Sequence, residues 1–302
     1  MRSKKILDVR VDLNIDIKYV LKKIEDRFLQ DSKFHYICTT NPEFIMEAQK
    51  NVDFKNIINK SDLSVPDGAG ILMAASYLNR VEGLNKNSFL YPFSCFILGL
   101  YTGIEHFLKF DLKDDRITGV QLAEKICEIS NTKKYSIFLL GGCPRDKKGN
   151  LIRSQKDLAE EAANNLQKKY PKANIIGATS QFGPDEKDDQ NTIKYIKRCM
   201  QKNKVNKLDF IMVAYGQYKQ EKWFIRNQMH IPVKLAIGVG RTFDYFSKYD
   251  KQPPVWMRNL RISWLYSLIK QPWRLKRVIN AFPIFPFKVF LSTLAKSSID
   301  IK

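Results

Sequence analysis

The sequence predicts an α/β fold built on a largely parallel sheet flanked by helices, with a basic helical appendage at its C-terminus. Short apolar segments rich in β-branched and aromatic residues alternate with longer amphipathic segments, as in sheets whose parallel strands are joined by helices. The composition then changes after about residue 245. We therefore divide the chain into a core over residues 1–246 and an appendage over residues 247–302.

The first strand is expected over residues 34–40, which are aromatic and β-branched and lead into Asn41-Pro42. Asparagine suits the cap of a helix and proline its first turn, and apolar residues continue at helical spacing over 43–60. A turn at residues 66–70 opens an apolar helix through Leu78. The later expected elements are helices over 119–130, 153–170 and 188–203, and strands over 135–140, 173–178, 208–214 and 233–237.

Polar or glycine turns follow four of the predicted strands, at residues 39–41, 141–142, 216 and 238–240. The carboxyl ends of parallel strands meet at one edge of a sheet, and ligands of such sheets bind in the crevice beyond that edge. We therefore expect the functional site where these four turns come together.

The chain is strongly basic, with 51 Lys and Arg residues against 31 Asp and Glu residues and a formal net charge of +20. This excess predicts an anionic partner: nucleic acid, anionic lipid or a phosphorylated substrate. A lysine-rich composition inherited from an AT-rich genome is the alternative explanation.

The cysteines and the N-terminus bear on cofactors and location. The five cysteines are scattered and the three histidines do not cluster near them, so a zinc site is not expected. An odd number of cysteines at scattered positions suits a reducing compartment, in which disulfides are rare. The first residues lack the apolar stretch of a signal peptide. Together with the cysteines, this predicts a cytoplasmic location.

Several nucleotide-binding and hydrolase motifs are absent from the sequence, including G-x-x-x-x-G-K-[ST] and G-x-S-x-G. Gly238-Val239-Gly240 lacks the third glycine of a dinucleotide fingerprint, which disfavours a nicotinamide-dependent oxidoreductase. The charge keeps a nucleic-acid-binding protein as an alternative, although no recognised binding module is present.

Residues 89–108 form a long apolar segment. Its uninterrupted apolar part is shorter than the roughly 20 residues that a spanning helix needs, and Pro92, Gly99 and Gly103 interrupt it. We expect an interfacial segment or a buried hairpin, and no segment of the chain is predicted to span a membrane.

Residues 255–291 carry seven basic residues, no acidic residue and three of the four tryptophans. The pattern predicts two short helices, broken at Pro272 and ending near Pro283. Aromatic rings at headgroup level, with cations facing anionic lipid, are typical of proteins that lie on a membrane surface. We expect this segment to be a membrane anchor whose removal leaves a folded core.

Individual polar residues in the turns of the chain suit a structural role as well as a functional one. Asp67 lies in a tight turn, where it suits either a helix cap or a general base in a pocket. Thr39 and Asn41 suit a strand end and a helix cap, and residues 219–222 suit an exposed helix start. Taken singly, none of these positions decides the function.

The order of the short motifs is more informative than any one of them. From the N-terminus they are T-x-N-P-E, P-D-G-x-G, R-I-T-G, F-L-L-G-G-x-P, G-x-x-K-Q-E-K-W, G-V-G-x-T-F-D, W-L-Y and Q-P-W-R-L. From about residue 35 to about residue 278, the chain resembles the WecG/TagA/CpsF family of bacterial glycosyltransferases. Those enzymes make wall teichoic acid, enterobacterial common antigen and capsular or exopolysaccharide glycans, and the resemblance implies a Rossmann-like core.

The resemblance implies an inverting glycosyl transfer that needs neither a metal ion nor a cofactor. The donor is expected to be a UDP-sugar carrying N-acetylmannosamine or a related hexose or uronic acid, and the acceptor a sugar on polyprenyl diphosphate. An anionic membrane surface is the expected third partner, with the protein peripheral on the inner face of the plasma membrane. A homo-oligomer stays open, and no nucleic acid partner is expected.

The resemblance also assigns roles to residues. Asp67 corresponds to the proposed catalytic base, and Thr39 and Asn41 correspond to an active-site threonine and asparagine. The expected nucleotide-sugar contacts are Gly68, Thr118, Gly141, Gly142, Gly216, Lys219, Gln220, Glu221, Gly238, Arg241 and Asp244. The expected membrane or acceptor contacts are Arg258, Arg261, Trp264, Arg274 and Arg277.

The sequence departs from the family pattern at Gln121, Arg241, Gln252, Ser263 and Ser267. These changes point either to a different substrate or to an inactive glycosyltransferase-like fold that serves as a basic nucleic-acid- or membrane-binding protein. Two segments, roughly 84–112 and 146–155, look like insertions, and the first offers a second membrane contact.

Overall fold

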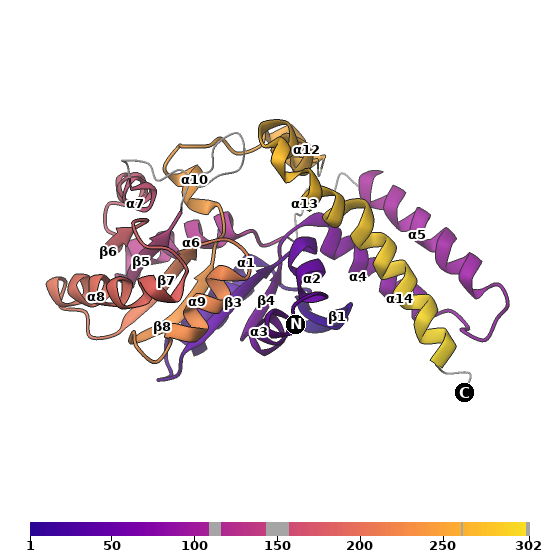
Figure 1. Ribbon diagram of the computed structural model, residues 1–302, viewed down its shortest axis with the longest axis horizontal. Coiled ribbons are helices and arrows are strands. Elements are labelled where there is room, and N and C mark those ends of the chain that lie inside the picture. Colours follow the sequence, from indigo (N-terminus) through magenta and orange to yellow (C-terminus); the bar gives the residue numbers. More distant parts are fainter. Residues whose placement is uncertain (109–115, 143–156, 261, 300–302) are drawn as a thin grey trace.

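The structure is a computed structural model that describes residues 1–108, 116–142, 157–260 and 262–299 (Figure 1). Within these residues the chain forms a six-stranded parallel sheet flanked by helices, and an N-terminal two-stranded hairpin. The strands of the large sheet lie in the order β4-β3-β8-β7-β5-β6. The predicted α/β fold with a Rossmann-like, parallel sheet is therefore confirmed.

The strands are β1 (Arg2–Ile6), β2 (Val9–Leu13), β3 (His35–Thr40), β4 (Leu63–Pro66), β5 (Ser136–Gly141), β6 (Asn174–Thr179), β7 (Leu208–Ala214) and β8 (Val233–Gly238). The five predicted strands correspond to β3 and to β5 through β8. Strand β4 is an addition to the prediction, because four residues that end in proline give little strand pattern. The β1–β2 hairpin is also additional, with Leu7 and Asp8 at φ 49° and 63° in its turn.

The core helices are α1 (Ile17–Lys23), a π-helical turn (Ile24–Phe28), α2 (Pro42–Ala48), α3 (Val52–Lys60), α4 (Ala69–Val81), α5 (Tyr91–Leu108), α6 (Gly119–Lys133), α7 (Leu158–Lys169), α8 (Glu186–Lys202), α9 (Lys219–Asn227) and α10 (Thr242–Phe246). The helix expected over 43–60 is divided into α2 and α3. Asn51 causes the division, because its side chain accepts a 3.0 Å hydrogen bond from the backbone N–H of Phe54 and caps α3. The start of the helix expected over 153–170, like the insertion expected at 146–155, lies outside the described residues.

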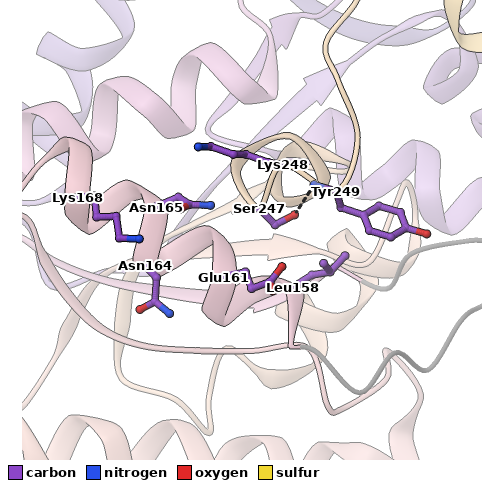
Figure 2. A pocket seen from close by; sticks show the side chains of 8 residues that line it. All are labelled: Leu158, Glu161, Asn164, Asn165, Lys168, Ser247, Lys248 and Tyr249. Carbon is purple, nitrogen blue, oxygen red and sulfur yellow. Dashed lines mark hydrogen bonds between the residues drawn. The ribbon is translucent and has the colours of Figure 1, made fainter.

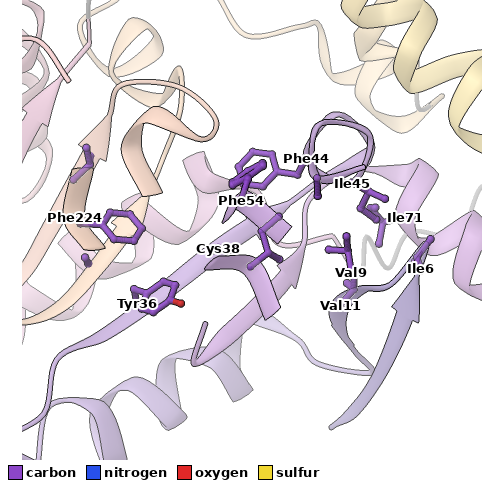
Figure 3. Packing of buried hydrophobic residues seen from close by; sticks show 14 of the residues in the cluster. Ile6, Val9, Val11, Tyr36, Cys38, Phe44, Ile45, Phe54, Ile71 and Phe224 are labelled. Carbon is purple, nitrogen blue, oxygen red and sulfur yellow. The ribbon is translucent and has the colours of Figure 1, made fainter. Parts of the chain in front are cut away.

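Two clusters of buried apolar side chains cover the two faces of the large sheet. On one face, Ile6 and Val9 of the hairpin pack with Phe44, Phe54 and Ile71 of α2, α3 and α4 (Figure 3). On the other face, α1, α6 and α7 contribute to the second cluster. Strands buried on both faces are continuously apolar rather than alternating, which is why they were recognisable in the sequence.

Helices α5 and α14 (Phe285–Ile299) lie side by side and project from the sheet domain, and we call this pair the helical arm (Figure 1). The rings of Phe96 and Phe290 are 6.4 Å apart, and the Tyr91 hydroxyl donates a 3.3 Å hydrogen bond to the carbonyl of Thr293. Because α5 is one continuous helix, the interpretation of residues 89–108 as a buried hairpin is wrong. An interfacial helix agrees with its exposed outer face.

The tail consists of α11 (Val255–Asn259), α12 (Ser263–Lys270), a 3-10 turn (Pro272–Arg274), α13 (Leu275–Ile279), a π-helical turn (Asn280–Ile284) and α14. It does not end near Pro283 as expected, because α14 continues through Ile299. Phe285 and Val289 are completely buried in the apolar cluster that α4 and α5 share. Deleting residues 255–302 would therefore open the core, so the expected folded truncation is not supported.

Within the described residues, one helical stretch, Pro272–Ala295, is long and apolar enough to cross a membrane by length and composition alone. The stretch has 24 residues and contains an 18-residue window with a mean hydropathy of 1.5, so by these criteria the expectation of no candidate membrane span was wrong. Extended backbone at Phe282, with φ −162° and ψ 119°, interrupts this stretch. Arg274, Lys276, Arg277 and Lys288 also lie in it, and cations are costly in the hydrocarbon core. Both features favour a helix that lies along a surface.

Candidate active site

The loops at the carboxyl ends of β3, β4, β7 and β8 enclose a polar cavity of about 300 Å³. The start of α6 and two arginines of the tail complete its walls. The structure thus brings together nine of the predicted site residues from distant parts of the sequence. They are Thr39, Asn41, Asp67, Thr118, Gly216, Gln220, Arg241, Arg274 and Arg277.

A second cavity, of about 330 Å³, adjoins the first along the same edge of the sheet. The two cavities share Gly216, Arg241, Arg274 and Arg277, so we treat them as one polar crevice. The second cavity adds three predicted positions, Gly142, Lys219 and Asp244. It also adds side chains that were not predicted, including Tyr215, Tyr249, Gln271 and Trp273.

A third cavity, of about 270 Å³, lies between the start of α4 and the tail, and we call it the apolar cavity. Its apolar walls come from both regions: Pro42, Ala69, Met73, Trp264, Val278, Ala281, Phe282 and Phe285. Asn41, Glu43 and Asp67 line both this cavity and the polar crevice. Asp67 therefore lies at the junction of a polar and an apolar cavity.

The backbone around Asp67 fixes its position. Its N–H donates a 2.8 Å hydrogen bond to the carbonyl of Thr40, which ties the end of β4 to the end of β3. Gly68 follows with φ 117°, a conformation that L side chains rarely adopt, and is itself the N-cap residue of α4. Asp67 thus precedes the cap position, which weakens the interpretation of this residue as a helix cap.

Thr39, Asn41 and Thr118 combine a structural role with a place in the crevice wall. The Thr39 hydroxyl donates to the carbonyl of Gly238 at 3.1 Å, joining β3 to β8. The Asn41 side chain accepts from the N–H of Phe44 at 3.0 Å and caps α2. Thr118 caps α6 in the same way by accepting from the N–H of Gln121 at 3.1 Å. Each of these side chains therefore holds a strand or helix end in place as well as lining the crevice.

Gln220 and Glu221 form a buried pair beneath the crevice. The Gln220 carbonyl oxygen accepts from the N–H of Gly240 at 3.1 Å, and its amide donates to Glu221 at 2.7 Å. A Cβ on Gly238 would lie 2.3 Å from the Gln220 amide, so that glycine permits close packing. Burial raises the pKa of Glu221 to about 7, against the opposing hydrogen bond from Gln220. The expected exposed helix start is therefore wrong for these two residues, while Lys219 is exposed.

Glu221 and Gly238 do not line the crevice, although the sequence suggested that they contact the nucleotide-sugar. They support Gln220 and the Gly240 loop from below. Gly141 does not line the crevice either. Its φ is 91°, and a Cβ at this position would lie 2.8 Å from the ring of Tyr215, so only glycine fits there. These three positions shape the site through packing.

The three arginines of the crevice differ in their partners. Arg241 forms ion pairs with Asp244, at 2.9 Å, and with Asp250. Arg277 pairs with Glu43 and donates to the Gln217 side chain at 3.1 Å. Two carboxylates balance Arg241, and one balances Arg277.

Arg274 has no carboxylate partner among the described residues. Burial, together with the neighbouring Arg277 and Arg241, lowers the pKa of Arg274 to about 10. It is still cationic at neutral pH, and an incoming anion would relieve the cost of its charge. Arg274 is therefore the guanidinium best prepared to bind a phosphorylated ligand.

The remaining predicted tail contacts are divided. Trp264 lines the apolar cavity, with its ring 6.3 Å from that of Phe282. Arg258 lines neither the crevice nor the apolar cavity; it is exposed and donates to the Gln252 side chain at 3.2 Å. Arg261 lies outside the described residues. Glu43 and Trp273 were missed, although they belong to the motifs T-x-N-P-E and Q-P-W-R-L.

A separate open cavity of about 560 Å³ lies between α7 and the residues that follow α10 (Figure 2). Its walls include Glu161, Asn164, Lys168 and Lys248, and no predicted site residue lines it. Its size alone does not make it a candidate for chemistry. In the described part of the chain, no three His, Cys, Asp or Glu side chains are grouped as metal ligands.

A parallel sheet with a polar, arginine-containing crevice at its carboxyl edge defines a class of enzymes that bind phosphorylated ligands. The sequence model of the glycosyl transferase WecG/TagA/CpsF family matches residues 4–88 and 102–298. The chain therefore belongs to this family and is a glycosyltransferase, as the order of its motifs indicated.

Two similar proteins are both named N-acetylglucosaminyldiphosphoundecaprenol N-acetyl-beta-D-mannosaminyltransferase. The one from Bacillus subtilis (strain 168) is 26% identical over 270 residues, which cover 89% of this chain and 84% of that protein. The one from Staphylococcus aureus (strain MRSA252) is 25% identical over 285 residues, which cover 94% of this chain and 91% of that protein. The similarity therefore includes both the sheet and most of the tail.

Proposed function

We propose that this glycosyltransferase moves a sugar, with inversion and without a metal ion, from a UDP-sugar to a sugar on polyprenyl diphosphate. The observation that carries the proposal is the position of Asp67 where the polar crevice meets the apolar cavity. A transferase with one nucleotide substrate and one lipid-linked substrate needs a base at the meeting point of two such spaces.

The donor fits the polar crevice. A nucleotide diphosphate carries negative charge that must be held as it leaves, and arginine side chains hold such charge through paired N–H donors. Arg274 supplies a positive charge that no carboxylate of the described residues pairs with, and Arg277 lines the same crevice. Arg241 was expected from the sequence to contact the nucleotide-sugar, but its pairs with Asp244 and Asp250 favour a role in shaping the crevice.

The acceptor fits the apolar cavity. The two similar mannosaminyltransferases are named for an undecaprenol-linked acceptor, which joins a sugar and diphosphate to a long apolar chain. In this chain the apolar walls of the cavity lead toward the helical arm, and Asp67 and Asn41 stand at its polar end. An acceptor sugar at that end would place a hydroxyl beside Asp67.

The chemistry follows from this placement. The Asp67 carboxylate accepts the proton of the acceptor hydroxyl while the oxygen of that hydroxyl forms a bond to the anomeric carbon of the donor sugar. The bond between that carbon and the diphosphate breaks on the opposite face, and the electron pair leaves with UDP. Arg274 and Arg277 stabilise the departing charge. The proton on Asp67 then passes to solvent.

The proposed location is the cytoplasmic face of the plasma membrane, with the protein bound peripherally. The exposed aromatic and aliphatic side chains of the tail support it: Trp256 is 58% exposed, and Ile269 and Leu275 are also exposed next to Lys270 and Lys276. Such a surface suits the headgroup region of an anionic bilayer.

Ligand binding followed by transfer tests the proposed function. Thermal shift with UDP-, GDP- and CDP-sugars should show stabilisation by the UDP-sugar, since a ligand that binds the folded state stabilises it. The stabilising UDP-sugar should then release UDP in the presence of N-acetylglucosamine on a prenyl diphosphate. Stabilisation by none of the nucleotides, or UDP release that does not depend on the acceptor, would contradict the proposal.

A further inference from the structure

The outer face of α5 carries an uninterrupted apolar stripe. Its side chains recur at helical spacing and are large and exposed, with Phe93 at 64%, Leu100 at 51% and Ile104 at 59% exposure. The described members on the helix are Phe93, Phe96, Ile97, Leu100, Tyr101, Ile104 and Leu108, and exposed Phe89 and Leu90 just before the helix extend the stripe. A contiguous apolar surface of this kind on a folded domain marks an interaction site.

The inner face of α5 packs against other helices of the chain. Cys95 and Thr102 are buried, and Arg80 of α4 donates to the Thr102 hydroxyl at 3.0 Å while pairing with Glu105. The one acidic residue of α5 is thus held on the inner side. The helix is fixed by α4 and α14, and its outer stripe carries no charge.

The sequence comparison gives this stripe a separate origin from the active site. The family model matches the chain on both sides of residues 89–101 but leaves those residues unmatched. Most of the stripe belongs to this unmatched segment. The stripe is therefore a feature that this chain adds to the shared fold.

We infer that the α5 stripe inserts into the apolar part of a lipid bilayer and is the main membrane anchor of this protein. Three observations favour lipid over a second copy of the chain. The stripe continues onto exposed Phe287 and Leu291 of α14, it lies on the same arm as the exposed cation Lys288, and it is rich in aromatic rings. Such a surface matches the boundary between headgroups and acyl chains.

The position of α5 relative to the apolar cavity supports the same inference. His106, near the C-terminal end of α5, lines that cavity, whereas the stripe extends away from it along the helix. A bilayer on the stripe would therefore lie next to the space proposed for the acceptor. This part of the inference depends on the proposed function, whereas insertion of the stripe does not.

Vesicle flotation of the full chain tests the inference. The parent protein should float with neutral phosphatidylcholine vesicles at both low and high salt, because burial of apolar surface is not screened. Substituting Phe93, Ile97, Leu100 and Ile104 together by Gln should reduce this binding on the order of tenfold or more. The variant should still bind vesicles that contain phosphatidylglycerol at low salt, through the basic tail.

Two further proteins serve as controls. Val52→Gln/Met229→Gln changes apolar side chains that are 69% and 87% exposed on the sheet domain, and it should float like the parent. The single change Leu100→Glu should weaken binding to neutral vesicles in a protein with unchanged helix content. This second variant decides the question if the fourfold variant fails to fold.

Three results would overturn the inference. They are unchanged neutral-vesicle binding by Leu100→Glu, loss of binding by the Val52→Gln/Met229→Gln control, or a dimeric parent that becomes monomeric without a change in flotation. Transfer to a short, water-soluble prenyl-diphosphate acceptor should be unaffected by the α5 substitutions. If the parent floats through α5 but transfers no sugar, the proposed function fails and the anchor stands.

Discussion

The two walls of the active site are built in different ways. The sheet wall is made of strand ends whose side chains are buried and hydrogen-bonded: Thr39 is 4% exposed and Gln220 is 1% exposed. The tail wall is made of short helices after residue 255, and the Arg277 side chain is 47% exposed there. The sheet thus supplies the proposed base, whereas the tail supplies charge and apolar surface from short, more exposed helices. Loss of either wall should affect the reaction differently.

The largest effect is expected on the sheet wall. Asp67→Asn removes the proton acceptor but keeps the size of the side chain, so turnover should fall on the order of 10²-fold or more. The dissociation constant for UDP should change little, because Asp67 does not face the diphosphate in the proposed arrangement. Steady-state rates and calorimetric UDP binding provide the two measurements. Asp53→Asn, an exposed carboxylate on α3, is the matched control, and retained activity in Asp67→Asn would refute the assignment.

The tail wall should show its effect on the donor. Arg274→Ala removes the guanidinium that has no carboxylate partner in the described part of the chain, and kcat/KM for the donor should fall roughly 10- to 100-fold. Arg241→Ala should instead lower stability, since it leaves Asp244 and Asp250 without their cation. Arg258→Ala, on the same tail but outside the crevice, should behave like the parent. An equal loss of activity in Arg258→Ala would mean that charge in general, rather than Arg274, is responsible.

A smaller effect is expected beneath the crevice. Because the pKa of Glu221 is raised to about 7 in the folded state from 4.5, the folded protein holds a proton that the unfolded chain releases between these pH values. The contribution of this group to stability is full below pH 4.5 and decreases as the pH rises to about 7, by at most about 3 kcal/mol. Urea unfolding of Glu221→Gln at pH 5, 6, 7 and 8 should lack this decrease. Parallel curves for the variant and the parent would show that Glu221 does not titrate in this range.

The smallest effect is expected from chelation. If the arginines of the tail wall hold the departing diphosphate, turnover should stay within about twofold in excess EDTA. Loss of activity with EDTA, restored by Mg²⁺ or Mn²⁺, would show that a metal ion shares this task. The metal ion would then be a third part of the active site, beside the sheet wall and the tail wall.

The sheet wall was largely predictable from the sequence, and the tail wall was not. Buried strands and the glycine or polar turns after them are local patterns, so the meeting of Thr39, Gly216 and Gly240 followed from the rule for parallel sheets. Asp67 was assigned by the family resemblance instead, because strand β4 before it was not predicted. The burial of Gln220 and Glu221 was not predicted, because the residues of a K-Q-E-K segment suggest an exposed helix face. Only the packing of α9 on β8 shows that two of them point inward.

The tail was harder to predict for a physical reason. Its helices are short and interrupted, so they lack the long periodicity that makes helices recognisable, and the extent of α14 was missed. The partners of its arginines are also distant in sequence: Arg277 pairs with Glu43, 234 residues away. That pairing is what separates Arg277 from Arg274, and no local pattern reveals it. Composition identified the tail as basic and aromatic, but not which cation faces the crevice.

The division of the site between sheet and tail has a consequence for side reactions. Water is a competing nucleophile for any activated sugar. Arg274 and Arg277 come from the tail and Asp67 comes from the sheet, so a variant whose tail is displaced would keep the proposed base and lose the charge that makes the nucleotide a good leaving group. Displacement of the tail should therefore slow hydrolysis of the donor together with transfer, and the activated sugar would be preserved.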